Sequence, residues 1–386
     1  MKSDYGLDTI VTHAGRYPDA HHGAVNVPVY RASTILIPTL EVLDNKESLR
    51  LRYGRRGTPT THALEDAICE LENADRALVA SSGVMAISVI LMSYAEPGAH
   101  FLVTDSSYGP TRKFCDSVLK KMGVTTTYYD PAAGATIDAL VRPETRLLWL
   151  ESPGSQTFEV QDVRAITDVA RKRGIATVID NTWSGGYFFK PLDCGVDISV
   201  QAGTKYISGH SDLMLGTIAC RESEYERLRE TYLRFGVCLG SDDAYLALRG
   251  LRTLGVRLRQ HHSAGLEVAH WLKQQEEVIS IMHPGLEDSP YHNLWKSYFT
   301  GASGLFGFVI RETDRARLAC MFDGFKLFGM GSSWGGFESL MTPSNPSVYR
   351  TATTWDPGGQ TVRIHVGLED PQDLIAEIRA GFDRLR

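Results

Sequence analysis

The sequence predicts an α/β protein with a mostly parallel sheet sandwiched by helices, followed by a smaller α+β domain. Short apolar strands alternate with helices, the first of them apolar, between about residues 76 and 200, and this pattern ends near residue 250. Parallel strands are joined by helical crossovers, so such an alternation is typical of this architecture. The chain has 386 residues and is 43% hydrophobic, which is ample for a buried core.

The first 57 residues are predicted to form an extended arm, because Pro28, Pro38 and the run Tyr53–Gly57 interrupt any long hydrophobic period of a helix or strand. A helix follows, and Thr60 or Thr61 is its expected N-cap. Its apolar residues recur at helical spacing: Leu64, Ala67, Ile68 and Leu71.

The next segment alternates between the two element types. Strands are expected at 76–80, 100–104, 147–150, 176–179 and 198–200. Helices are expected at 83–94, at 111–122 with Phe114, Val118 and Met122 facing inward, and at 163–173. After residue 250 we expect helices at 264–275 and 371–385 and strands at 305–310 and 362–366. The expected units are therefore an arm (1–57), a larger α/β domain (58–250) and a C-terminal domain (251–386).

Composition excludes several classes of protein. The net charge is −6 without a basic stripe, which argues against nucleic-acid binding. Apolar runs such as 86–92 are too short to span a bilayer, and the N-terminus lacks the apolar core of a secretory signal. Six scattered cysteines without a CxxC pair suit neither a zinc site nor a disulfide scaffold. A cytoplasmic globular enzyme is the expectation.

Two histidine pairs and one arginine-rich segment are not expected to form a functional site. The pairs His21-His22 and His261-His262 are expected to be solvated or structural, because adjacent side chains rarely converge on one metal ion. The arginine-rich segment 249–259 is expected to be solvated or to face another subunit.

Ligands bind beyond the carboxyl ends of strands in such sheets, so the residues after each strand are candidates for a site. Strand 76–80 leads into Ser81-Ser82-Gly83, where a glycine at a helix start lets N–H groups approach a phosphate; a simple tight turn is the alternative. Strand 100–104 leads to Tyr108, which is either a stacking group for a planar cofactor or a partly buried surface tyrosine.

Two later strand ends carry opposite charges. Asp180 follows an apolar strand and, as a buried carboxylate, needs a cationic partner; a helix N-cap or a structural ion pair is the alternative. Lys205 follows strand 198–200 in a glycine- and hydroxyl-rich loop and is either a Schiff-base nucleophile or a solvated lysine. With the upstream turn and Tyr108, these groups meet the needs of pyridoxal 5'-phosphate (PLP): a lysine, a carboxylate and a phosphate cradle.

Several stretches spread over residues 25–386 carry a family resemblance: YGRRGTPTTHALEDAICELE, the turn 81–83, LESPGS, VIDNTW, QAGTKYISGHSDLMLGT, ALRGLRTLGVRLRQHH, SSWGGFESL and RIHVGLED. On these stretches the sequence resembles the Cys/Met-metabolism family of PLP enzymes, of fold type I, and within it the bacterial cystathionine β-lyases. Lyases and synthases share most of the stretches, so they indicate the family more specifically than the reaction.

The resemblance implies a role for each candidate residue. Lys205 would bind the cofactor aldehyde and later move the Cα proton, Asp180 would pair with the pyridine nitrogen, and Tyr108 would stack on the ring. The phosphate ligands would be the backbone of Gly83 and Val84, the hydroxyl of Thr204 and, from a neighbouring subunit, Tyr53 and Arg55.

For the substrate, the resemblance implies that Arg363 clamps a carboxylate, with Ser333, Trp334 and Ser155 nearby. Its two-pronged guanidinium suits that role, although a surface arginine on a strand is the alternative. Ser155 stands where many relatives have asparagine, and Ala202 where many have serine. Both departures, and Trp183, fit the β-lyases, whereas the loop 341–346 does not.

The implied activity is a PLP-dependent C–S β-lyase of methionine biosynthesis that cleaves L-cystathionine to homocysteine, pyruvate and ammonia by α,β-elimination. The alternatives are a β-lyase for cystine or another cysteine S-conjugate, a γ-lyase or γ-synthase, and a non-catalytic PLP-binding regulator. The expected partners are an amino-acid substrate and further copies of the chain, without nucleic acid or membrane. Tyr53 and Arg55 require at least a dimer, and the resemblance implies a tetramer built from two dimers.

Overall fold

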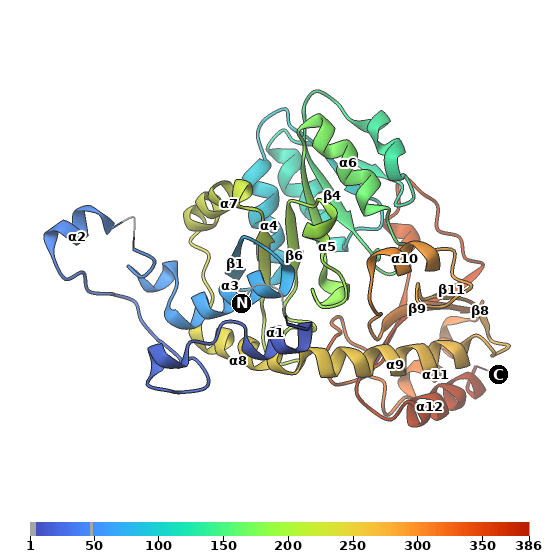
Figure 1. Ribbon diagram of the computed structural model, residues 1–386. Helices are drawn as coiled ribbons and strands as arrows, with labels where there is room; N and C mark the ends of the chain where they lie inside the picture. The colour runs from blue at the N-terminus through green and yellow to red at the C-terminus, as the bar shows by residue number, and fades with distance from the viewer. Residues whose placement is uncertain (1–4, 47–48, 386) are drawn as a thin grey trace.

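The computed structural model describes residues 5–46 and 49–385, and two β-sheets lie side by side in it (Figure 1). Residues 1–4, 47–48 and 386 lie outside the described residues. The larger sheet occupies the centre of the view, and the smaller sheet lies near the C-terminus.

The larger sheet has seven strands in the order β1-β7-β6-β5-β4-β2-β3. The pairs β2–β3, β2–β4, β4–β5 and β5–β6 are parallel, whereas β7 is antiparallel to both of its neighbours. The predicted mostly parallel sheet is therefore confirmed, although β3 and β7 were not predicted. The strands are β1 (Arg76–Ala80), β2 (His100–Thr104), β3 (Thr125–Tyr129), β4 (Thr145–Glu151), β5 (Ala176–Asp180), β6 (Ile198–Gln201) and β7 (Gly216–Cys220).

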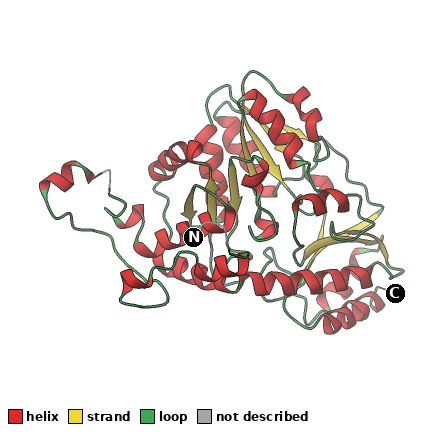
Figure 2. Ribbon diagram, viewed as in Figure 1, coloured by secondary structure: helices red, strands yellow, loops and turns green. Residues whose placement is uncertain are grey.

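Helices cover both faces of this sheet, as Figure 2 shows. Alternate strand residues point to opposite faces, so Phe101 and Val103 pack in one apolar cluster while Leu102 packs in another. The first face is covered by α4 (Gly83–Tyr94), α5 (Gly109–Phe114) and α7 (Glu222–Arg234). The other is covered by α3 (Pro59–Glu72), α6 (Val163–Arg173) and α8 (Ser241–Arg252).

The helix predicted at 111–122 differs from its observed form. It begins at Gly109, and a π-helical turn occupies Cys115–Leu119. Cys115 and Leu119 are buried, and Phe114 packs partly against them, but Val118 and Met122 are 39% and 37% exposed. The predicted inward position is wrong for Val118 and Met122, because a π-turn changes which residues face the sheet.

Helix α3 begins earlier than its expected cap. Thr58 is the N-cap, with its hydroxyl accepting from the Thr61 N–H at 3.4 Å while the Thr61 hydroxyl accepts from the Thr58 N–H at 2.8 Å. This reciprocal pair satisfies two backbone donors, and Pro59 occupies the first helical position. The predicted N-cap at Thr60 or Thr61 is therefore wrong.

The smaller sheet is antiparallel, in the order β10-β11-β9-β8. Its strands are β8 (Val278–Met282), β9 (Leu305–Arg311), β10 (Leu340–Ser344) and β11 (Gly359–His365). An apolar core joins it to α9 (Leu254–Leu272), α11 (Arg315–Asp323) and α12 (Pro371–Asp383), and α10 (His292–Tyr298) packs beside the larger sheet. The strands predicted at 305–310 and 362–366 and the helix at 371–385 are confirmed in all but their ends. The boundaries at residues 57 and 250 stay predictions.

The N-terminal region is only partly extended. Helix α1 (Leu7–His13) packs on the body through Val11, which is 3% exposed. The segment around α2 (Leu40–Asp44) projects away from the rest of the chain (Figure 1). There Leu36 and Leu40 are 88% and 77% exposed, which leaves an apolar surface without cover in a single chain.

The arginine-rich segment 249–259 does not form a wholly solvated face. Arg257 is 5% exposed and donates to the carbonyls of Tyr206 and Gly250, each at 2.8 Å. Arg252 donates to two carbonyls near α1, those of Val11 and Ala14. Burial lowers the pKa of both arginines to about 10. The predicted solvated or subunit-facing position is wrong for these two residues, which instead satisfy backbone acceptors.

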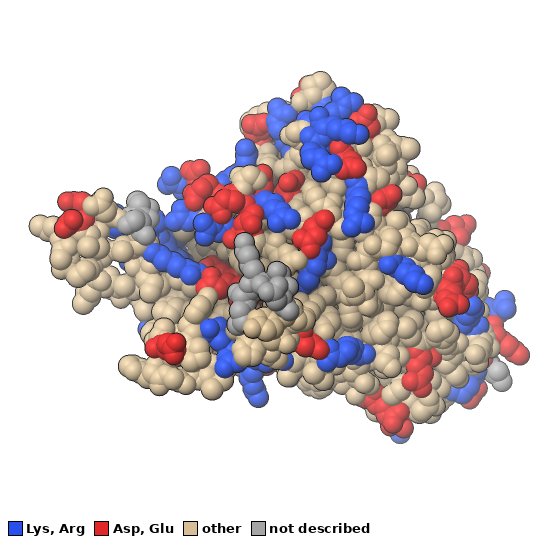
Figure 3. Space-filling model, viewed as in Figure 1, with Lys and Arg blue, Asp and Glu red and all other residues tan. Residues whose placement is uncertain are grey.

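The molecular surface carries mixed charges on the face drawn in Figure 3. None of the helices among the described residues combines the length and the hydropathy of a bilayer-spanning segment. Nor do three His, Cys, Asp or Glu side chains of those residues gather into a group that could hold a metal ion. His261 is fully buried and bonded to the carbonyl of Val366 at 2.9 Å, as expected of a structural histidine.

A buried polar network lies beneath the carboxyl ends of β5 and β6. Glu72, the last residue of α3, is 0% exposed and accepts hydrogen bonds from Asn181 at 3.2 Å, Ser199 at 3.1 Å and Gln201. Burial raises the pKa of Glu72, while nearby Lys190 and the bonded side chains oppose that rise. One carboxyl group thus accepts hydrogen bonds from polar side chains at β6 and just after β5.

We expect Glu72→Ala to lower the free energy of unfolding by about 3 kcal/mol, because it leaves several buried donors without an acceptor. Urea unfolding followed by circular dichroism measures the change. The control is Glu230→Ala, which removes an exposed carboxylate. Glu230 Oε1 forms a surface ion pair with Arg234 Nη2, at 3.6 Å. Equal midpoints for the two variants would show that the network contributes nothing to stability.

Candidate active site

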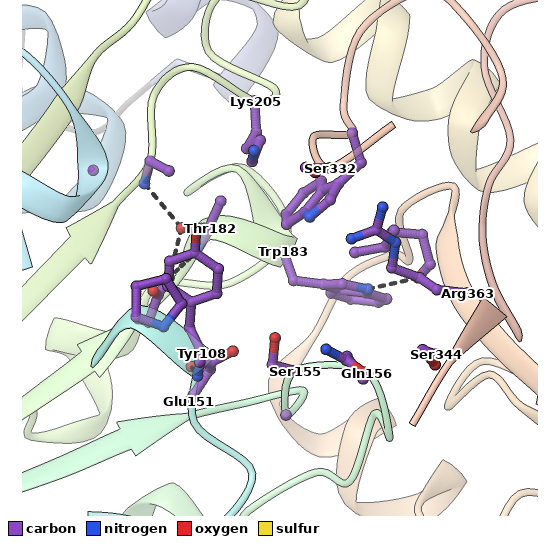
Figure 4. Close-up of a pocket in the computed structure, with 18 of the residues that line it drawn as sticks. Tyr108, Glu151, Ser155, Gln156, Thr182, Trp183, Lys205, Ser332, Ser344 and Arg363 are labelled. Atoms are coloured by element: carbon purple, nitrogen blue, oxygen red, sulfur yellow. Dashed lines mark hydrogen bonds between the residues drawn. The ribbon is translucent and has the colours of Figure 1, made fainter. Parts of the chain in front are cut away.

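A cavity of about 800 Å³ lies between the carboxyl ends of the parallel strands and the smaller sheet (Figure 4). Most of the residues predicted from the sequence line it: Gly83, Val84, Tyr108, Ser155, Asp180, Thr204, Lys205, Trp334 and Arg363. Ser333 is not part of the lining but contacts Lys205. The two sheets therefore contribute opposite walls of one site.

Asp180 ends β5 and is 9% exposed. Its Oδ1 accepts from the N–H of Thr182 at 3.0 Å and from the Thr182 hydroxyl at 2.5 Å. That hydroxyl oxygen also accepts from the Ala202 N–H at 2.9 Å, which ties together the loops after β5 and β6. Burial raises the pKa of Asp180, whereas the Thr182 bonds and nearby Lys205 lower it. A cation facing this carboxylate from the cavity would stabilise its ionised form.

Lys205 lies in the loop after β6, with its amine in the cavity. Its Nζ donates to the hydroxyl of Ser333 at 2.7 Å and lies 5.4 Å from the centre of the Trp334 ring. Burial and the nearby Arg363 charge lower the pKa of Lys205 to about 8, with Asp180 opposing the change. The amine thus lines the cavity and has a lowered pKa, as expected of a Schiff-base lysine; the assignment of that role stays a prediction.

Two glycines allow the backbone to approach closely around this lysine. A Cβ on Gly335, which has φ +85°, would lie 3.0 Å from the Cβ of Lys205. A Cβ on Gly83 would lie 2.7 Å from the Cβ of Ala202. Side chains at these positions would push apart the segments that form the cavity.

The start of helix α4 and Thr204 both line the cavity. Ser82 is its N-cap, and the Ser82 hydroxyl accepts from the Met85 N–H at 3.1 Å. Gly83 and Val84, in the first turn, line the cavity. The Thr204 hydroxyl also lies there and accepts from the Leu215 N–H at 2.8 Å. N–H groups of a first turn and the helix dipole both favour a phosphate.

Arg363 projects from β11 into the cavity, on the wall facing the strand ends (Figure 4). Its Nη2 donates to the carbonyls of Gly331 at 2.7 Å and Ser333 at 3.3 Å. Burial lowers the pKa of Arg363, partly offset by Tyr108. The alternative of a surface arginine is therefore wrong, and this guanidinium is placed to meet a carboxylate.

Tyr108 and Glu151 lie together on the strand-end wall. The Tyr108 N–H donates to Glu151 Oε2 at 2.6 Å, and Glu151 is the register partner of Asp180. Burial and the Asp180 charge raise the pKa of Glu151 well above its usual value, and the same two causes, with Glu151, raise that of Tyr108. Sequence reasoning missed Glu151, although it ends β4 just as Asp180 ends β5.

The loop after β4 supplies further residues that the sequence did not indicate. Gln156 and Phe158 both line the cavity and have positive φ, 66° and 59°. Side chains rarely adopt this conformation, so the loop is strained where it meets the site. The Oε1 atom of Gln156 is buried and without a partner among the described residues. No sequence pattern signals this strain.

Tyr53 and Arg55 do not line the cavity of their own chain. Tyr53 is 44% exposed, and Arg55 donates to the Leu233 carbonyl at 3.3 Å. Their predicted contact with the phosphate of a neighbouring subunit stays a prediction.

The residues around the cavity fit PLP by their chemistry. A lysine amine suits its aldehyde, a buried carboxylate suits its ring nitrogen, and a helix N-terminus with a hydroxyl suits its phosphate. These groups, from Lys205, Asp180, Gly83 and Thr204, line one cavity.

Comparison with known proteins agrees with this fit. The family described as "Cys/Met metabolism PLP-dependent enzyme" matches residues 8–383. The "Cystathionine beta-lyase MetC" of Escherichia coli (strain K12) is 44% identical over 395 residues, covering 99% of this chain and 100% of the relative. The "L-alanine/L-glutamate racemase" of Wolbachia pipientis wMel is 40% identical over 393 residues, covering 98% and 97%.

A solved structure described as the "Crystal structure of metB from Corynebacterium glutamicum" superposes with a TM-score of 0.91 at 28% identity, covering 99% of each chain. The predicted family, fold class and cofactor are therefore confirmed. This chain belongs to the Cys/Met-metabolism family of PLP-dependent enzymes.

Proposed function

We propose that this enzyme is a C–S β-lyase that converts L-cystathionine and water to homocysteine, pyruvate and ammonia. The observation that carries the proposal is that Lys205, Asp180 and Arg363 face one cavity, in a chain that matches a cystathionine β-lyase over its full length. The amine, carboxylate and guanidinium are the groups that α,β-elimination from an amino acid requires.

PLP would be held by the groups that line the strand-end side of the cavity. When bound, it supplies an electron-withdrawing ring that accepts the electron pair left when a bond at Cα breaks. Asp180 would face the ring nitrogen, Tyr108 the ring, and the first turn of α4 with Thr204 the phosphate.

Lys205 would take the Cα proton of the substrate at its Nζ atom. A pKa of about 8 gives this amine an appreciable neutral fraction near neutral pH, which is what a general base needs. The Ser333 hydroxyl, 2.7 Å away, would orient the amine.

The remaining residues would orient the substrate and protonate the leaving group. Arg363 would hold the α-carboxylate, so that the Cα–H bond faces Lys205. The departing thiolate would take a proton from Lys205 or from Tyr108, whose raised pKa keeps its phenol protonated. Trp334 and Ser155 would line the space beside the substrate.

The enzyme would act in the cytoplasm as a tetramer built from two dimers. Its six cysteines are free thiols, which suits a reducing compartment. The segment around α2 projects from the body with exposed Leu36 and Leu40, which suits burial against a second subunit. The arm 1–57, the cofactor-binding domain 58–250 and the C-terminal domain 251–386 would be its structural units, and Tyr53 and Arg55 would complete the partner's phosphate site.

Purified holoenzyme with L-cystathionine should release pyruvate and a free thiol in equal amounts. Lactate dehydrogenase coupling measures the pyruvate, and a thiol reagent measures homocysteine. Formation of 2-oxobutyrate and cysteine would make the protein a γ-lyase. In a parallel assay with L-alanine, formation of D-alanine, with no pyruvate from cystathionine, would make the protein a racemase. Binding of PLP without turnover of any substrate would make it a regulator.

Lys205→Ala should abolish turnover and the visible absorbance of lysine-bound PLP, because the variant lacks the amine that binds the aldehyde. The absorbance spectrum and the pyruvate assay measure the two effects. Lys296→Ala, which removes a lysine from outside the cavity lining, is the control. Full activity of Lys205→Ala would refute the assignment.

Arg363→Met should lower kcat/KM for cystathionine about 100-fold, because it removes charge-assisted hydrogen bonds to the substrate carboxylate. Steady-state kinetics measure the loss, and Arg363→Lys should recover part of it. The control is Arg173→Met, since Arg173 forms an exposed ion pair with Asp138. If kcat/KM of Arg363→Met stays within threefold of the wild-type value, a residue other than Arg363 binds the substrate carboxylate.

A further inference from the structure

One wall of the cavity comes from the end of β10 and the segment that follows it. Ser344 lines the cavity at the end of β10 (Figure 4), and Asn345, Val348 and Tyr349 continue that lining. This wall overlaps the loop 341–346, where the sequence departs from the β-lyases. We call residues 345–349 the substrate wall.

The chain directly after the substrate wall is anchored to the larger sheet by a buried carboxylate. Asp105, which is 2% exposed, follows β2. It accepts from three consecutive backbone N–H groups: Thr351 at 3.0 Å, Ala352 at 3.1 Å and Thr353 at 2.9 Å. Arg112 donates to the same carboxylate at 3.0 Å.

These bonds keep Asp105 charged. Burial alone would raise the pKa of this carboxyl group, but the bonds from Thr351 and Thr353, together with Arg112, lower it overall. A buried carboxylate with this many donors has a single well-defined geometry, and losing it would leave several donors unsatisfied.

A second anchor holds the same segment. Arg350 pairs with Glu159 at 2.5 Å and donates to the Thr353 hydroxyl at 2.9 Å. The Arg350 and Glu159 side chains are 5% and 12% exposed. Glu159 directly follows the cavity-lining Phe158, so this pair ties the substrate wall to the loop after β4.

The two anchors fix the substrate wall relative to the cofactor side of the cavity. Asp105 lies three residues before Tyr108, and Arg350 directly follows Tyr349. A Cβ on Gly109 would be 3.9 Å from Cε1 of Tyr349, so the Tyr349 ring lies at contact distance beyond that glycine. A shift at either anchor would therefore move Tyr349 relative to Tyr108.

We propose that the substrate wall contacts the sulfur substituent of the substrate, and that Asp105 is a positioning residue which sets the wall's selectivity for that substituent. This rests on the proposed C–S lyase function, in which Lys205 and Arg363 meet the amino-acid end. Asn345, Val348 and Tyr349 supply an amide, an apolar side chain and a phenol. These side chains suit contact with a long substituent such as that of cystathionine. An S-methyl group is too short to reach them and would gain no binding energy from them.

The test compares kcat/KM of the holoenzyme for L-cystathionine and S-methyl-L-cysteine, through pyruvate release. In Asp105→Asn and in Tyr349→Ala we expect the cystathionine to S-methylcysteine ratio to fall about tenfold. This ratio does not depend on the concentration of active enzyme, so partial unfolding cannot imitate the effect. The control Asp138→Asn breaks an exposed ion pair with Arg173 and should leave the ratio unchanged.

The outcomes separate the two proposals. Ratios within twofold of the wild type in both variants would overturn the role of the substrate wall while leaving the lyase function intact. A wild-type enzyme that releases pyruvate from neither substrate would overturn the lyase function, and this inference with it.

Discussion

The meeting of parallel strand ends at one edge of the sheet is the constraint on which the rest of the site depends. Because β4 and β5 run in register, Glu151 and Asp180 end side by side, and the loop after β6 places Lys205 near them. Burial and the Asp180 charge raise the pKa of Glu151 well above its usual value, and positive charge nearby favours the ionised form of Asp180. Lys205 supplies some of it, and the donors of Thr182 hold Asp180 in place.

Much of the fold could be predicted because its signals are local. Apolar runs predicted β1, β2, β4, β5, β6 and the apolar helix α4, and helical spacing predicted α3 and α6. Strand β3, TTTYY, is half-exposed and therefore lacks an apolar run, so its pairing with β2 decides its conformation. The bond from buried Arg257 to the Tyr206 carbonyl is likewise a tertiary contact, to a residue 51 positions earlier in the chain.

In the candidate site too, some residues could be predicted from local sequence and others depend on tertiary contacts. Asp180 and Lys205 stand at strand ends and are visible in the sequence, whereas the position of Arg363 depends on which face of β11 turns towards the larger sheet. Glu151 could have been found by applying the strand-end rule once more. Asp105 could not, because the backbone N–H groups that it binds lie about 250 residues further along the chain and belong to a segment without regular structure.

Ser333 connects the two charged groups that would act on a substrate. Its hydroxyl accepts from Lys205, and its carbonyl accepts from Arg363 at 3.3 Å. A carboxylate that draws the guanidinium away from this carbonyl alters the same residue that holds the amine. The proposed carboxylate clamp and the proposed base would therefore share one neighbouring residue, Ser333.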